Sequence, residues 1–254
     1  MQTNTPALSS EDLFGLKFIS SRFDRFVQTI TDLVQDEKNI TIFPVNVDVL
    51  LKSKQDADFF FILKNAYFIT PDGIPILWAS RILGKKLTAK ISGSDLFPAL
   101  CKAAAENEYR VFFLGAKPGV AQRASVNIKK LYPKLDIAGV YSPPFGFEKA
   151  EKENKNIVKM IVDKKPDILF VGLGALKQEK WIWRYKDKIN VPISMAVGAS
   201  FDYIAGNIKR APRWMQRYGL EWFFRLCQEP RRLWKRYLLG NLIFIWTVFK
   251  ESIK

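Results

Sequence analysis

Two acidic residues follow apolar runs of the sequence, and the first of them is a candidate for proton transfer. Asp72 lies in Thr70-Pro71-Asp72-Gly73, and Asp202 follows the apolar run 193–197. Because the chain contains no His, a general base must come from a carboxylate or, less commonly, from Lys, Tyr or Cys. A structural interpretation is open for both residues: Pro-Asp-Gly is an ordinary turn, and an acidic residue is favourable at the start of a helix. The functional interpretation makes Asp72 a general base at a ligand-binding crevice.

Two glycine-bounded turns are candidates for phosphate binding. Gly115-Ala116-Lys117-Pro118-Gly119 follows one apolar run, and Gly172-Leu173-Gly174 follows another. Free N–H groups at the start of a helix, with a Lys nearby, suit a phosphate group. Tight strand-to-helix turns have the same composition, so each turn alone is weak evidence, but together on one edge of a sheet they support a nucleotide site. The second turn lacks the third glycine of a dinucleotide fingerprint, because Lys177 occupies that position.

The composition excludes several kinds of chemistry. Without His, the chain cannot use a Ser-His-Asp triad, a Cys-His pair or a His-ligated zinc. Cys101 and Cys227 are far apart in helix-like patterns, and we expect buried free thiols.

Asp56-Ala57-Asp58 matches the D-x-D pattern with which many sugar-nucleotide transferases hold a divalent cation. Its expected position in the middle of a helix favours a solvated face, so we assign no metal to it.

Short apolar runs alternate with longer amphipathic segments over most of the chain. The runs predict strands at residues 40–45, 67–70, 111–114, 137–140, 168–171 and 193–197. The segments between them predict helices at 47–64, 74–83, 93–107, 119–131, 149–164 and 177–188. Continuous apolar strands separated by helices are typical of a parallel sheet covered on both faces. The expected fold is therefore α/β, a Rossmann-like doubly wound, mostly parallel sheet that binds ligands beyond the carboxyl ends of its strands.

The alternation stops near residue 203, and the remaining sequence is basic and rich in Trp. Residues 206–254 hold 11 Lys and Arg against three Asp and Glu, with four of the seven Trp. This composition predicts a helical appendage, residues 206–254, on a catalytic core, residues 1–205. Basic residues interleaved with aromatics suit a surface that meets phosphate, in nucleic acid or in anionic lipid.

Helical spacing predicts how the charges of the appendage are arranged. Arg217, Glu221 and Arg225 are four residues apart, so they are expected on one helical face. Arg232, Lys235 and Arg236 are expected on another, and such a basic row could clamp a diphosphate. The alternative is an amphipathic helix pair with solvated charges. The apolar run 242–249 is too short to cross a bilayer, so we expect a protein that touches a membrane without spanning it. Residues 1–14 show no signal peptide and the Cys residues are expected to be free, and both expectations favour the cytoplasm.

Five groups of motifs occur in one order along residues 40–241. They are Thr70-Pro71-Asp72-Gly73-Ile74 with Ala79-Ser80-Arg81-Ile82-Leu83-Gly84, Ser92-Gly93-Ser94-Asp95-Leu96, Phe113-Leu114-Gly115-Ala116-Lys117-Pro118-Gly119, Val171-Gly172-Leu173-Gly174 with Lys177-Gln178-Glu179, and Lys209-Arg210-Ala211-Pro212-Arg213-Trp214 with Gly219-Leu220-Glu221-Trp222 and Gln228-Glu229-Pro230-Arg231-Arg232. In this order they resemble the WecG/TagA/CpsF family, glycosyltransferase family 26. The first 38 residues add nothing to the resemblance.

The resemblance implies an inverting, metal-independent glycosyltransferase that needs no cofactor. Such enzymes move a sugar, often N-acetylmannosamine or its uronic acid, from a UDP-sugar to an undecaprenyl-diphosphate-linked saccharide at the cytoplasmic face of the membrane. Asp72 matches the family's proposed catalytic Asp, and Asn46, Lys90, Gln178 and Asp202 are expected to line the donor pocket. The other expected substrate-binding residues are Asp95, Gly115, Lys117, Gly172, Gly174, Arg225, Arg232 and Lys235.

This sequence departs from the family pattern near the expected donor site. Pro44 replaces a Thr and cannot donate a side-chain hydrogen bond, while Lys90 replaces an Arg and loses its bidentate geometry. Ala175-Leu176 replaces the commoner Met-Pro pair. These departures concern the identity of the donor sugar.

Two other classes of function remain open at this point. A nucleic-acid-binding protein would explain the charge but leaves the strand-end motifs without a role. A dinucleotide-dependent oxidoreductase would explain the sheet, but the third glycine is missing, as is an acidic ribose partner at the right spacing. The resemblance instead implies a UDP-sugar donor, a lipid-linked acceptor and an anionic membrane surface as partners, without nucleic acid.

Overall fold

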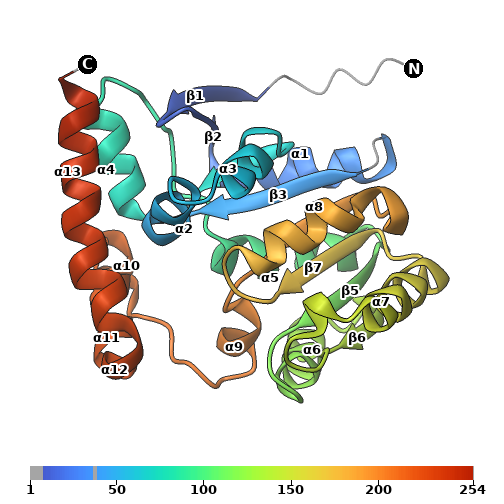
Figure 1. Ribbon diagram of the computed structural model, residues 1–254. Coiled ribbons are helices and arrows are strands. Elements are labelled where there is room, and N and C mark those ends of the chain that lie inside the picture. The colour runs from blue at the N-terminus through green and yellow to red at the C-terminus, as the bar shows by residue number, and fades with distance from the viewer. Residues whose placement is uncertain (1–7, 37–38, 254) are drawn as a thin grey trace.

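A computed structural model describes residues 8–36 and 39–253, and its centre is an eight-stranded sheet of order β1-β2-β4-β3-β8-β7-β5-β6 (Figure 1). The strands are β1 Ser9–Leu13, β2 Leu16–Ser20, β3 Ile40–Val45, β4 Phe68–Pro71, β5 Arg110–Gly115, β6 Asp136–Tyr141, β7 Ile168–Gly172 and β8 Ile193–Ala196. β1 and β2 form an antiparallel hairpin, and all other pairings are parallel. The carboxyl ends of β3, β4, β7 and β8 therefore meet at one edge.

Helices cover both faces of the sheet. The helices of the core are α1 Phe23–Asp36, α2 Val47–Ser53, α3 Ala57–Lys64, α4 Ile74–Ile82, α5 Gly93–Glu106, α6 Val120–Leu131, α7 Glu151–Lys164, α8 Lys177–Ile189 and α9 Ser200–Ile204, with a 3-10 turn at Phe147–Lys149. Successive residues of a strand point to opposite faces. Thus Phe43 and Val45 of β3 pack in the cluster with α2, α3, α4, α7 and α8, whereas Ile40 and Ile42 pack with α1, α5, α6 and α9. The doubly wound α/β expectation is confirmed.

The structure confirms the six predicted strands and adds a hairpin and a helix before them. Phe14 and Gly15 both have positive φ, 59° and 79°, which suits the two-residue turn between β1 and β2. Most of β1 is exposed, so it lacks the apolar run that marks the other strands. This lack explains why no strand was predicted at β1.

The predicted helix 47–64 is wrong in one respect, because it is two helices. Asp56 has extended backbone and caps α3, since its side chain accepts a hydrogen bond from the backbone N–H of Phe59 at 2.9 Å. It also forms an ion pair with Lys180. The D-x-D pattern therefore lies at a helix start, not within a helix, and Asp56 has a structural role there.

The appendage consists of several helical segments that pack on the core. They are α10 Arg213–Arg217, α11 Glu221–Gln228, α12 Pro230–Trp234, the π-helical segment η2 Lys235–Leu239 and α13 Gly240–Ser252. In Figure 1, α13 stands beside α4 at the end of the sheet toward which β3 points. Phe244 and Val248 of α13 are buried in the same cluster as β3 and α2. The described part of the appendage, residues 206–253, thus completes one face of the core.

Two expectations about the appendage are wrong. A single helical face for Arg217, Glu221 and Arg225 is excluded, because the chain turns at Gly219, where φ is 73°, between α10 and α11. Gly219 lies so close to α4 that an added Cβ would lie 2.9 Å from Cβ of Ile74. Cys227 is exposed, whereas Cys101 is buried as expected, and both are free thiols.

The glycines at the ends of β5 and β7 have a packing role. Gly115 pairs with Gly172 in register, and a Cβ on Gly115 would lie 2.4 Å from the carbonyl oxygen of Gly172. A Cβ on Gly172 would lie 2.6 Å from the ring of Phe201. The two strand ends can approach each other, and helix α9, only because neither residue has a side chain.

We expect Gly115→Ala to lower the free energy of unfolding by about 2–4 kcal/mol. The alanine would have to adopt the positive φ of 115° at this position, and its Cβ would clash with the backbone of Gly172. Gly84→Ala is the matched control, since Gly84 also has positive φ but no atom within 4 Å of an added Cβ. Gly84→Ala should lower the free energy of unfolding by about 1 kcal/mol. Denaturant unfolding measures both. If both variants lose the same free energy of unfolding, the close approach of Gly115 to Gly172 does not contribute to stability.

Candidate functional site

A cavity of about 300 Å³ lies at the carboxyl ends of the central strands. The core contributes residues that follow β3, β4, β7 and β8, among them Asn46, Asp72, Gly174 and Gly198. The appendage forms the opposite wall with Glu221 and Trp222 of α11, and with residues of α12, η2 and α13. The position agrees with the general rule for doubly wound sheets, in which ligands bind beyond the carboxyl ends of the strands.

Asp72 is a half-buried carboxylate on the core side of this cavity. Its backbone N–H donates to the carbonyl of Val45 at 3.1 Å, which fixes the turn after β4 beside the end of β3. The side-chain amide of Asn46 donates to Asp72 Oδ2 at 3.1 Å. Burial raises the pKa of Asp72, although the hydrogen bond from Asn46 and the charge of Lys90 oppose the rise. A carboxylate with a raised pKa is a better proton acceptor than a free Asp.

Asn46 holds two elements in place. It is the N-cap of α2, and its side-chain oxygen accepts a hydrogen bond from the backbone N–H of Val49 at 3.2 Å. Its amide nitrogen is then directed toward Asp72. One side chain therefore fixes the start of α2 and orients the candidate base.

Three arginines of the appendage line the opposite wall: Arg225, Arg232 and Arg236. The guanidinium of Arg225 lies over the ring of Tyr203, 5.6 Å from its centroid. Tyr203 also lines the cavity, and burial raises the pKa of its hydroxyl to about 12, so this residue stays neutral. Arg232 is exposed and paired with Glu229. The cavity thus has the carboxylates of Asp72 and Asp48 on the core side, and three arginines together with Glu221 on the appendage side.

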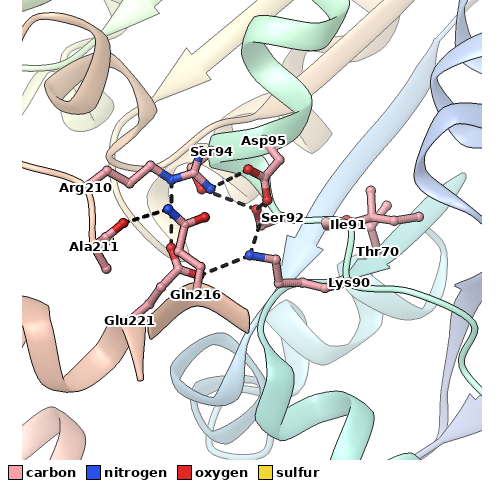
Figure 2. A network of polar contacts seen from close by, with 10 residues as sticks. All are labelled: Thr70, Lys90, Ile91, Ser92, Ser94, Asp95, Arg210, Ala211, Gln216 and Glu221. Atoms are coloured by element: carbon pink, nitrogen blue, oxygen red, sulfur yellow. Dashed lines mark hydrogen bonds and ion pairs between the residues drawn. The ribbon is translucent and has the colours of Figure 1, made fainter. Parts of the chain in front are cut away.

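Next to the cavity, four charged side chains join the core to the appendage (Figure 2). Lys90 Nζ lies 3.3 Å from Asp95 Oδ2 and 3.1 Å from Glu221 Oε2. Arg210 forms an ion pair with Asp95 and lies 3.8 Å from Glu221. The group contains two cations and two anions, so it carries no net charge. It ties the segment before α10 and the start of α11 to the loop before α5.

The network also controls the ionisation of its members. Burial disfavours the charged form of Asp95, but the charges of Lys90 and Arg210 and a hydrogen bond from Ser92 outweigh it and hold the pKa of Asp95 below its usual value. Burial likewise opposes the charge on Lys90, but Asp95 and Glu221 raise its pKa. Both residues therefore remain charged near neutral pH.

Gln178 connects the cavity to a buried acid. Its side-chain oxygen accepts a hydrogen bond from the backbone N–H of Gly198 at 3.0 Å, and its amide donates to Glu179 at 2.8 Å. Glu179 is fully buried, and burial raises its pKa to about 7. Gln178 thus fixes the turn after β8 against the start of α8 on the wall of the cavity.

Comparison with known proteins identifies the family. The sequence model described as "Glycosyl transferase WecG/TagA/CpsF family" matches residues 11–254. The chain belongs to this family. It is therefore a glycosyltransferase, and the nucleic-acid-binding and oxidoreductase interpretations of the sequence are set aside.

Curated relatives of this glycosyltransferase carry one description, N-acetylglucosaminyldiphosphoundecaprenol N-acetyl-beta-D-mannosaminyltransferase. The protein of Bacillus subtilis (strain 168) is 34% identical over 246 residues, which cover 96% of this chain and 93% of the relative. That of Bacillus spizizenii is 35% identical, covering 91% and 88%, and that of Staphylococcus aureus (strain MW2) is 29% identical, covering 96% and 93%.

The structure brings about half of the sequence-predicted site residues of this glycosyltransferase to the cavity wall. Asp72, Asn46, Gly174, Gln178, Arg225 and Arg232 line it. Lys90 and Asp95 lie beside it in the charge network. Their contacts are with Glu221 and Arg210, so the structure places them where core and appendage meet.

The remaining predicted residues lie outside the cavity lining in the described part of the chain: Gly115, Lys117, Gly172, Asp202 and Lys235. Lys117 is exposed in the turn before α6. Asp202 lies in α9, where its carboxylate accepts a hydrogen bond from Asn207 at 3.1 Å. Lys235 is exposed, and its ammonium lies over the ring of Trp234 at 5.4 Å.

Several cavity residues were not singled out as site residues from the sequence: Asp48, Tyr203, Glu221 and Tyr237. Arg236 was expected only as one member of a basic row of the appendage. Asp48 is two residues after Asn46 in the same helical turn, so its proximity could have been inferred. Glu221 lies within a matched motif. The position of Arg236 depends on how the appendage docks, and no local pattern in the sequence reports that.

Proposed function

We propose that this glycosyltransferase moves a sugar from a UDP-sugar to an undecaprenyl-diphosphate-linked saccharide with inversion at the anomeric carbon and without a metal ion. The sugar is N-acetylmannosamine, its uronic acid or a related hexose, and the product serves cell-surface polysaccharide or teichoic acid synthesis. The names of the relatives support the acceptor and the transferred sugar. The observation that carries the proposal is that a half-buried carboxylate, Asp72, and three arginines of the appendage line the same cavity.

In the proposed reaction, Asp72 takes the proton of the acceptor hydroxyl while that oxygen attacks the anomeric carbon. The bond between this carbon and the oxygen of the diphosphate breaks in the same displacement, so the configuration inverts. Asn46 keeps the carboxylate oriented through its 3.1 Å hydrogen bond. A single base on one side of the sugar and a leaving group on the other are sufficient for this chemistry.

The leaving UDP gains negative charge as the bond breaks, and the arginines are placed to stabilise it. Guanidinium groups bind phosphate oxygens through two parallel hydrogen bonds. Arg225 and Arg236 supply such groups on the wall opposite Asp72. In the proposal these arginines stabilise the negative charge of the leaving diphosphate, as a divalent cation does in other sugar-nucleotide transferases.

The proposed function is tested by incubating the protein with a panel of UDP-sugars and a short-chain GlcNAc diphospholipid and measuring the release of UDP. We expect release that requires both substrates and persists in EDTA. Analysis of the anomeric configuration of the product checks inversion. Release of UDP from no member of the panel would refute the donor class.

We also propose that the protein associates peripherally with an anionic membrane. Among the described residues, no helix is long and apolar enough to cross a bilayer. Exposed apolar side chains are nevertheless concentrated on α13, where Leu242, Ile245, Trp246 and Phe249 are each more than half exposed. Aromatic side chains beside basic residues favour the headgroup layer of a membrane.

We expect the double variant Trp246→Ser/Phe249→Ser to bind anionic vesicles at least tenfold more weakly, because both rings are exposed and stack on each other outside the core. Co-sedimentation with vesicles measures the binding. Phe61→Ser, which removes an equally exposed ring from α3, is the control and should leave binding unchanged. Equal losses in the two proteins would contradict a membrane-binding role for α13.

A further inference from the structure

The aromatic side chains on the wall of the cavity all carry a polar group. They are Tyr203, Trp222 and Tyr237, and no Phe occurs among the described residues that line the cavity. The chain as a whole has the opposite preference, with 20 Phe against eight Tyr and seven Trp. An aromatic face joined to a hydrogen-bonding group suits a ligand that has both apolar and polar surface.

Two of these rings lie together on the appendage side. The ring centroids of Trp222 in α11 and Tyr237 in η2 are 6.0 Å apart, and the ring planes form an angle of 54°. The guanidinium of Arg236 lies 5.4 Å from the centroid of the Tyr237 ring, and its Nη2 lies 3.3 Å from Asp48 Oδ2. Because Asp48 belongs to α2, the ion pair holds this aromatic pair against the core.

The polar groups of the three rings are free to meet a ligand. In the part of the chain that the structure describes, no hydrogen bond engages the hydroxyl of Tyr203, the hydroxyl of Tyr237 or the indole N–H of Trp222. None of the three atoms belongs to the unpaired polar atoms that solvent cannot reach. Burial raises the pKa of Tyr203 to about 12, so its hydroxyl keeps its proton and can donate.

The ring of a hexose has the complementary chemistry. Its faces present C–H groups, whose partial positive charge is attracted to the negative face of an aromatic ring. Its rim carries hydroxyl groups, which bond to neutral donors and acceptors such as a phenol. An acetamido group adds an apolar methyl group and an amide. Phosphate groups, in contrast, favour the guanidinium groups of the same cavity.

We infer that Trp222, Tyr237 and Tyr203 form a sugar-binding wall that holds the ring of an N-acetylhexosamine. The indole of Trp222 packs against a face of the sugar, and the two tyrosine hydroxyls bond to its polar groups. This inference rests on the proposed function for the identity of the sugar. An N-acetylhexosamine occurs both in the proposed donor and in the proposed acceptor, so the test separates these two sources.

The test measures how much the sugar adds to the affinity of a ligand for the full-length protein. For the donor, calorimetry gives the ratio of the Kd of UDP to the Kd of UDP-N-acetylmannosamine. For the acceptor, it gives the ratio of the Kd of a short-chain diphospholipid without GlcNAc to the Kd of the same lipid with GlcNAc. A loss of the sugar contacts lowers the ratio for the ligand whose sugar meets the wall.

We expect Trp222→Leu to lower one of the two ratios about 10-fold, because leucine keeps apolar volume but has no aromatic face. Tyr203→Phe and Tyr237→Phe should each lower the same ratio by about 3- to 10-fold, the effect of one neutral hydrogen bond. The Kd of the ligand without the sugar should stay within about twofold of wild type in every variant.

Two matched controls come from the region of α10. Trp214→Leu and Tyr218→Phe make the same changes at side chains that are 58% and 65% exposed and lie outside the cavity lining. Both ratios should be unchanged in these variants. A fall in the UDP-sugar ratio assigns the wall to the donor, and a fall in the GlcNAc ratio assigns it to the acceptor. Equal losses for ligands with and without the sugar, or no change in either ratio, overturn the inference.

Failure of this inference is distinguishable from failure of the proposed function. A wild-type protein that binds the sugar-bearing ligands but transfers no sugar refutes the proposed function, while the two ratios still test the wall. Trp222 also contacts the ring of Phe223, with centroids 5.9 Å apart, so thermal unfolding must show that Trp222→Leu is folded. The two Tyr→Phe variants keep their rings and the packing of those rings, and they test the inference even if Trp222→Leu does not fold.

Discussion

Asp72→Asn abolishes sugar transfer, with an expected fall in kcat of at least about 10³-fold, while the affinity for UDP stays within about twofold of wild type. The amide has nearly the shape of the carboxylate but cannot accept the proton of the acceptor hydroxyl. Asn46 can still contact it, so the turn after β4 should keep its conformation. Single-turnover transfer and calorimetric UDP titration measure the two effects. Full activity in this variant would eliminate Asp72 as the base.

The pH dependence gives an independent check on the same residue. Asp72 must be ionised to act as a base, so kcat/KM falls as the pH drops through its pKa in the free enzyme. Burial raises that pKa, and the acid limb should therefore lie above the usual Asp range near pH 4. Asn46→Ser retains a cap for α2 but removes the amide that lowers this pKa, so the limb should move to higher pH. A limb that moves to lower pH contradicts the assignment.

Arg225→Ala lowers kcat/KM for transfer by about 10²–10³-fold, the effect of removing one preorganised donor from a developing oxyanion. Arg225 lines the cavity opposite Asp72, with its guanidinium held over Tyr203. Its remaining ion pair, with Glu229 at 3.7 Å, is long and leaves the charge largely available. Steady-state kinetics with a saturating acceptor measures the effect.

The control for Arg225 is Arg231→Ala, which removes the same charge from an exposed position of the appendage. We expect it to change transfer by less than about twofold, so the comparison separates a local role from the overall charge of the appendage. Arg225→Lys should recover only part of the activity, because an ammonium lacks the planar fork. Equal effects of the two alanine variants would indicate that only net charge matters.

The charge network explains why the core and the appendage should act together. Lys90 and Asp95 belong to the core, and Arg210 and Glu221 belong to the appendage. The ion pairs of Lys90 with Glu221 and of Arg210 with Asp95 therefore form only when the appendage is docked. The same docking brings Arg225 and Arg236 to the cavity. The proposed division into residues 1–205 and 206–254 therefore describes sequence composition, whereas the cavity needs both parts.

Much of the core could be predicted from local patterns. Strands buried on both faces appear as continuous apolar runs, so the six parallel strands from β3 to β8 were located within a few residues. The edge strand β1 was missed because it is mostly exposed and has no such run. The buried β2 and the amphipathic α1 were missed as well, although their patterns could have predicted them. The break between α2 and α3 depends on one side chain, Asp56, capping the backbone of Phe59.

By itself, the sequence determined the family, the doubly wound sheet and the candidate base, because strand burial and strand-end motifs are local features that residue types and spacing record. Only the tertiary structure decided which charges face the cavity. Helical spacing predicts that Lys235 and Arg236 share one face. In the structure, the docking of the appendage and the π-helical segment bring Arg236 to Asp48 and leave Lys235 exposed. Likewise, Lys90 and Glu221 are 131 residues apart and meet only in the folded chain. The direction of a side chain depends on contacts with distant segments, and no spacing along the sequence specifies those contacts.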